Sequence, residues 1–139
     1  MDLIITLLLV NALRAEPLVE SDILDARAEI RAEYLCKQSQ WSHEGWVESF
    51  KDVPYQYAGE NLAINFSDSL DVEHAWMASP EHKANIMNRE FREVGFGMAS
   101  GMYEGKPTTF VVQMFGTPVE SGVAIVPVGV PKKTPKVVA

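Results

Sequence analysis

The sequence predicts an α+β fold, because its N-terminal part has helical spacing of apolar residues and residues 91–116 have strand patterns. The chain has 139 residues, 47% of them apolar, which suits one domain with one core. Its net charge of −7 disfavours nucleic acid as a partner, since nucleic acid attracts basic surfaces. Cys36 is the only cysteine, so packing rather than an internal disulfide must hold the fold.

The apolar run at residues 3–10 predicts a buried first helix that ends near Ala15. A cleaved signal peptide is the alternative interpretation. Asp2 stands where such peptides carry a positive charge, however, and no small-residue cleavage site follows before Arg14. The run is also shorter than the roughly 20 residues that cross a bilayer. We therefore expect a core helix and no transmembrane segment.

A second, amphipathic helix is predicted to start after Ser21, which suits the N-cap position. Its inward residues at helical spacing are Leu24, Ala28, Arg31, Ala32 and Leu35. A short helical pattern follows within residues 41–52, and residues 68–78 predict a further helix. The tryptophans are expected to anchor the core, because large aromatic side chains dominate small cores; they are Trp41, Trp46 and Trp76.

Ser79 and Pro80 suit the N-cap and first positions of another helical turn, which places His82 near a helix start. Residues 91–116 then predict a β-hairpin that turns within GMYEGK. We assign residues 1–116 to one domain and residues 117–139 to an extended tail rich in proline and valine. This tail is expected to dock on another chain or, alternatively, to fold back on its own domain.

Three side chains are candidates for one functional site: His43, Glu60 and His82. They lie far apart in sequence, so only the fold can bring them together. Two imidazoles and a carboxylate are ligands that zinc or another divalent cation accepts. The alternative is that these groups hydrogen-bond one another or the backbone, as buried polar groups usually do. His74 is expected to be solvated.

Several motifs in register resemble the CAP superfamily, which comprises cysteine-rich secretory proteins, antigen 5 and pathogenesis-related 1 proteins. The similar segments, in order, are NALR at 11–14, residues 24–32, SH at 42–43, GENLA at 59–63, WMASPEHKANIM at 76–87 and FREVGFG at 91–97. The similarity is to the short bacterial branch of the superfamily. It implies an α-β-α sandwich, in which helices cover both faces of a small antiparallel sheet.

The resemblance also implies a shared cleft lined by His43, Glu60 and His82, where some family members bind a divalent cation. The second Glu of the family cleft falls at Ser79 in this chain, so we count Ser79 among the cleft residues. Glu73 and Glu81 are nearby candidates to supply its charge. We expect Glu60 to organise the two histidines and neighbouring backbone amides, and expect Glu60→Gln to leave the fold largely intact.

The function expected from this resemblance is a non-catalytic binding module. Its partners would be a small ligand, such as a lipid or glycan, or another protein. A metal-dependent hydrolase that uses the same cleft is the alternative, with a divalent cation such as zinc as its cofactor. The family also suggests an extracellular location or a place in a surface assembly or viral particle, where the C-terminal tail would contact its neighbour.

Overall fold

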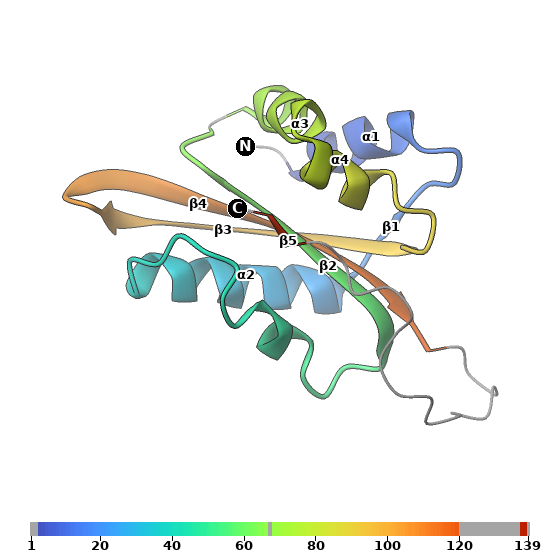
Figure 1. The fold of residues 1–139 in the computed structure, drawn as a ribbon, viewed down its shortest axis with the longest axis horizontal. Helices are drawn as coiled ribbons and strands as arrows, with labels where there is room; N and C mark the ends of the chain where they lie inside the picture. Colours follow the sequence, from blue (N-terminus) through green and yellow to red (C-terminus); the bar gives the residue numbers. More distant parts are fainter. Residues whose placement is uncertain (1–2, 67, 120–136, 139) are drawn as a thin grey trace.

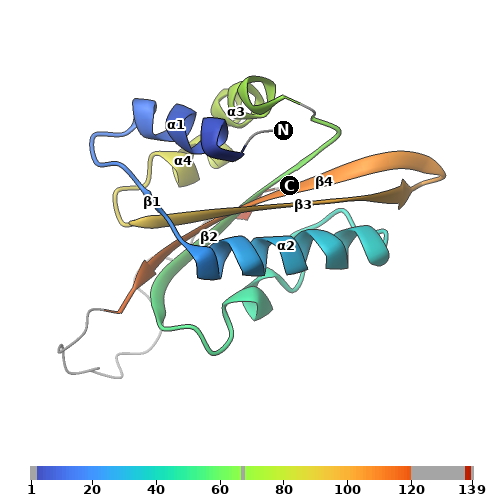
Figure 2. The ribbon, with the colours of Figure 1, turned by 180° about the vertical axis from the view of Figure 1, so that it is seen from behind.

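The computed structural model describes residues 3–66, 68–119 and 137–138. In chain order its elements are α1 (Leu3–Leu13), β1 (Val19–Glu20), α2 (Asp22–Lys37), the 3-10 helix η1 (Trp46–Phe50), β2 (Tyr55–Ile64), α3 (Ser69–Ala78), α4 (Pro80–Ile86), β3 (Glu93–Tyr103), β4 (Lys106–Pro118) and β5 (Val137–Val138). A sheet forms the middle layer, with α1, α3 and α4 on one face and α2 and η1 on the other (Figures 1 and 2). This arrangement confirms the α+β class and the three-layer sandwich.

The strands follow the order β1-β3-β4-β2-β5 across the sheet. The three long strands, β2, β3 and β4, are antiparallel, as predicted, and the two short strands add parallel pairs at the edges. The predicted hairpin joins β3 to β4 through Glu104 and Gly105. Both of these residues have positive φ, at 49° and 76°, which is the geometry of a tight two-residue hairpin turn.

The predicted helices form where their caps predict them. The Ser21 side chain accepts a hydrogen bond from the Leu24 amide and starts α2. Asp68 caps α3, and Ser79 and Pro80 begin α4, which puts His82 in its first turn. The apolar run near the N-terminus forms α1, as predicted. Among the described residues, no helix is long and apolar enough to cross a membrane.

Two hydrophobic clusters fill the spaces on either side of the sheet. One lies under α1, α3 and α4 and includes Trp76 and Phe115, and the other lies under α2 and includes Leu24 and Phe110. Trp76 is almost completely buried, which confirms it as a core anchor. Trp41 and Trp46 are only partly buried, so they lie at the margin of the core.

The tail departs from the predicted boundary at residue 116, because β4 continues to Pro118. Residues 120–136 lie outside the described part of the chain. At the far end, Val137 and Val138 pair with Glu60 and Asn61 of β2. Val137 and Val138 therefore fit the alternative in which the tail folds back on its own domain. Docking on another chain stays a prediction.

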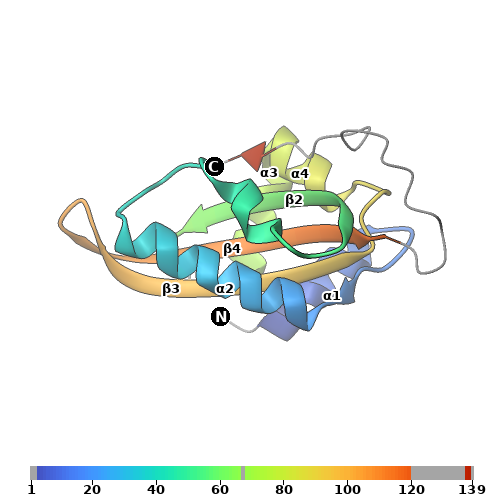
Figure 3. The ribbon, with the colours of Figure 1, turned by 90° about the horizontal axis from the view of Figure 1, so that it is seen from below.

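Helix α2 lies directly across β3, as the view from below shows (Figure 3). Glycines make this close approach possible, because a Cβ atom on Gly97 would overlap the backbone of Ala28 and Glu29. The contact fixes the height of α2 above the sheet, and with it the position of every side chain that α2 presents to β2.

We expect Gly97→Ala to destabilise the fold by about 3 kcal/mol, because neither backbone can move without unpacking α2. Gly101→Ala is the matched control, since its Cβ would meet only the flexible end of the Cys36 side chain. Urea unfolding of both variants measures the difference. Equal midpoints would contradict this account of the α2 contact.

Candidate functional site

Glu60 lies in the middle of β2, and the pairing of that strand decides where its side chain points. Glu60 is opposite Met114 and Asn61 is opposite Gln113 on β4. Successive residues of a strand point to opposite faces of a sheet. Glu60 therefore faces the α2 layer, where Met114 packs, and Asn61 faces the layer that contains α4.

The Glu60 side chain is completely buried, and its carboxylate is bonded to Arg31 and His43. Nε of Arg31 donates to Oε2 at 2.9 Å, and Nη2 of Arg31 is 3.3 Å from Oε1. Nδ1 of His43 is 2.9 Å from Oε1, in position to donate its proton to the carboxylate. The Arg31 side chain is only 3% exposed, so it and Glu60 form a buried ion pair. The predicted contact between His43 and Glu60 is thus present.

Arg31 is the partner that the sequence reasoning missed. Besides Glu60, its guanidinium donates to the carbonyl oxygens of Ser42, at 3.2 Å, and Glu44, at 3.1 Å. One side chain of α2 therefore holds both β2 and the loop that carries His43. Its position in the sequence could have indicated this role, because an arginine at the inward spacing of an amphipathic helix needs a buried anion as its partner.

Asn61 makes a second polar network on the opposite face of β2. Its Nδ2 donates to the His82 carbonyl at 3.2 Å and to Oε1 of Gln113 at 3.0 Å. Asn85 of α4 donates to Oδ1 of Asn61 at 2.9 Å and to the Glu60 carbonyl at 3.2 Å. These bonds fasten α4 to β2. Asn61 thus links strand β2 both to α4 and to β4.

His82 and Ser79 lie in a hollow of about 220 Å³ at the open edge of β2. Its lining residues are Trp41, Leu62, Ala63, Ile64, Phe66, Ala75, Trp76, Ser79 and His82. His43 and Glu60 are not among them. Of the four predicted cleft residues, Ser79 and His82 line this hollow, and His43 and Glu60 are bonded to each other on the α2 side of the sheet.

The predicted metal ligands do not fit a metal ion in this arrangement. Both Glu60 oxygens already accept hydrogen bonds, from Arg31 and His43. Across residues 3–66, 68–119 and 137–138, no three His, Cys, Asp or Glu side chains lie close enough together to hold an ion. The divalent cation therefore stays a prediction, and the function proposed below does not use it.

The two candidates for the missing family Glu differ in burial. Glu81 is exposed, whereas Glu73 on α3 is only 2% exposed. Burial raises the pKa of Glu73 to about 8, although the nearby Gln113 amide lowers it in part. In the described part of the chain, neither Glu73 oxygen has a hydrogen bond of good geometry. Burial therefore favours the protonated form of Glu73, which makes this residue a poor substitute for a charge. His74 beside it is exposed, as predicted.

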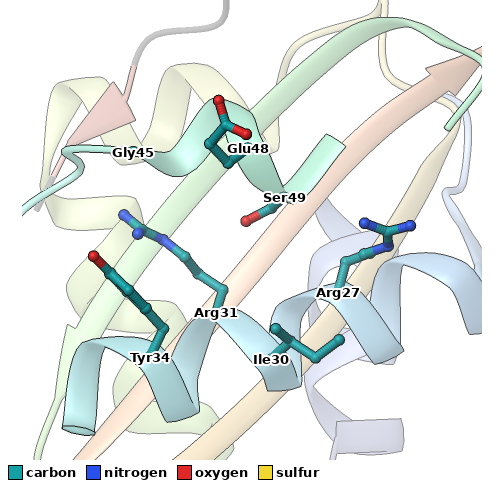
Figure 4. A pocket seen from close by; sticks show the side chains of 7 residues that line it. All are labelled: Arg27, Ile30, Arg31, Tyr34, Gly45, Glu48 and Ser49. Carbon is teal, nitrogen blue, oxygen red and sulfur yellow. The ribbon is translucent and has the colours of Figure 1, made fainter. Parts of the chain in front are cut away.

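A groove of about 270 Å³ lies between α2 and η1 (Figure 4). Its lining residues are Arg27, Ile30, Arg31, Tyr34, Gly45, Glu48 and Ser49. The four from α2 follow the i, i+3, i+4, i+7 spacing, which puts them on one helix face. Arg31 belongs to this face and to the Glu60 ion pair. The ion pair therefore holds the two walls of the groove together.

We expect Glu60→Gln to destabilise the fold by about 3 to 5 kcal/mol, because it leaves the Arg31 charge buried without a counter-ion. This replaces the expectation, drawn from the sequence, that the variant is tolerated. The double variant Arg31→Met with Glu60→Met removes both charges and should recover most of the loss. Chemical unfolding of the single and double variants measures this coupling. A double variant no more stable than Glu60→Gln would contradict it.

The raised pKa of Glu73 predicts a pH dependence of stability. Between its unfolded pKa near 4.5 and its folded pKa near 8, the unfolded chain releases a proton that the folded chain keeps. Stability should therefore fall as pH rises from 5 to 8, by on the order of 3 kcal/mol, and level off above that range. Glu73→Gln should remove this fall. Thermal unfolding of both proteins at pH 5 and pH 8 tests it, and parallel pH profiles would contradict it.

Comparison with known proteins supports the resemblance to the CAP superfamily that the motifs and the fold indicate. The protein YkwD of Bacillus subtilis (strain 168), named as uncharacterized, is 28% identical over 90 residues, which are 59% of this chain and 35% of that protein. The chain thus spans about a third of the length of that relative.

Solved structures share the fold at low sequence identity. An outer surface protein from Borrelia burgdorferi has a TM-score of 0.71 at 21% identity, over 85% of this chain and 93% of its own. An extracellular protein containing a SCP domain from Bacillus anthracis has a TM-score of 0.68 at 24% identity, over 80% of this chain and 38% of its own. The model of the cysteine-rich secretory protein family, CAP, matches residues 9–115, and the chain therefore belongs to the CAP family.

Proposed function

We propose that this CAP domain is a non-catalytic binding module whose ligand lies in the groove between α2 and η1. The observation that carries the proposal is the Arg31–Glu60 ion pair. The Glu60 carboxylate holds Arg31, which lines the groove, and is therefore not free to act in a reaction. A general base must be able to reach the proton it removes. Glu60 has no exposed surface, and its oxygens are already bonded.

The groove suits a ligand with an apolar body and an anionic head. Ile30 and Tyr34 offer apolar surface, and they are 61% and 49% exposed. Arg27 stands at one end of this row on α2 (Figure 4). In the described residues, its guanidinium has no hydrogen bond or ion pair, so it is available to pair with a carboxylate. A fatty acid or a similar lipid has this chemistry.

The metal-dependent hydrolase has less support in the geometry, because Arg31 and His43 already bond to the Glu60 carboxylate that is expected to hold its ion. We also propose that the protein acts outside the cell or at a surface. Support comes from the relatives described as an outer surface protein and an extracellular protein. A role within a larger assembly, such as a viral particle, is a further proposal that depends on the C-terminal tail.

Binding of a fluorescent fatty acid, with oleic acid and oleyl alcohol as competitors, tests the proposed ligand class. We expect wild type to prefer the acid over the alcohol by about tenfold, through one charge-assisted hydrogen bond from Arg27. Arg27→Gln should lose this preference, and Ile30→Asp should weaken binding of both competitors.

Arg89→Gln is the matched control, because Arg89 is exposed and lies outside the groove. Its preference for the acid should equal that of wild type. Absence of binding to wild type, or equal effects of the two arginine variants, would overturn the groove as the lipid site.

A further inference from the structure

The outer edge of β2 is paired along only part of its length. On its inner side, β2 pairs with β4 from Tyr55 to Ile64. On its outer side, β5 covers only Glu60 and Asn61. Within the described residues, no strand pairs with the outer edge from Leu62 to Ile64. One group of this stretch is already bonded, because the Leu62 carbonyl accepts a hydrogen bond from Nε1 of Trp76 at 3.1 Å. The other backbone N–H and C=O groups of an unpaired edge can pair with another extended segment.

The hollow beside this edge has walls from both helical layers. Trp41 comes from the layer that contains α2, whereas Trp76 and His82 come from α3 and α4. Its floor includes Leu62, Ala63 and Ile64, the residues that follow the pairing with β5. Because β5 runs parallel to β2, a segment that enters at Glu60 is directed toward this hollow. The C-terminal strand also contacts α4 (Figure 3).

We infer that the outer edge of β2 is a docking site for the C-terminal segment of this chain, and that the segment of a second copy can replace the chain's own. Recognition is by strand addition: the backbone of the incoming segment pairs with the outer edge of β2 at Glu60 and Asn61, as Val137 and Val138 do within one copy. The occupant is already seated in cis, so exchange between copies needs no new interface. The inference does not depend on the lipid groove, which lies on the α2 side.

A peptide with residues 131–139, PKKTPKVVA, labelled at its N-terminus, tests this site on the full-length protein. Val138→Pro removes the backbone N–H of one β5 residue and should release the chain's own strand from β2. The peptide should then bind Val138→Pro at least tenfold more tightly than wild type, because the edge is no longer occupied. Val128→Pro is the matched control, and it should bind the peptide as weakly as wild type.

Hydrogen exchange at the amides of β2 adds a readout that a general loss of stability would not reproduce. Exchange at Leu62 should be faster in Val138→Pro than in wild type and should slow again when the peptide is added. The amides of β3 should be unchanged. Equal peptide binding by all three proteins, no binding by any, or a peptide carrying the same Val138→Pro change that binds equally well would overturn the inference.

Discussion

The buried ion pair between Arg31 and Glu60 is the interaction on which the rest of the site depends. It joins the middle of α2 to the middle of β2, and the same guanidinium reaches the carbonyls of Ser42 and Glu44. Such a pair is costly to form, since both charges must leave water, but removing one partner is costlier still. The ion pair therefore stabilises one specific arrangement of α2, β2 and the loop that carries Ser42 and Glu44.

The Arg31–Glu60 ion pair explains why a carboxylate in the middle of a core strand need not be catalytic. Glu60 holds His43 on one oxygen and Arg31 on both, which leaves it little capacity to bind anything else. Meanwhile the ordered loop leads into η1, and η1 forms one wall of the groove above Ile30 and Tyr34. The charged groups thus determine the shape of the groove, and its exposed surface is largely apolar.

The alternation of side chains along β2 divides the polar residues of the GEN motif between two layers. Glu60 serves the α2 layer, and Asn61 serves α4 through His82, Gln113 and Asn85. Because β2 lies near the edge of the sheet, residues of both layers also meet around that edge, where the aromatic hollow lies. One strand therefore supports the groove, the hollow and the pairing with the C-terminus.

The sequence by itself determined the helices, the β3–β4 hairpin and the family, because these depend on local signals. Ser21 and Pro80 mark helix starts, the turn at Glu104 and Gly105 marks the hairpin, and the spaced motifs identify a CAP domain. Only the tertiary structure decided the partners of the buried polar groups. A charge on an inward helix face predicts that a counter-ion exists, but which carboxylate meets Arg31 depends on strand register and on the close packing that Gly97 allows. For the same reason, spacing could not separate His82 from His43, since residues distant in sequence are placed by the layers of the fold.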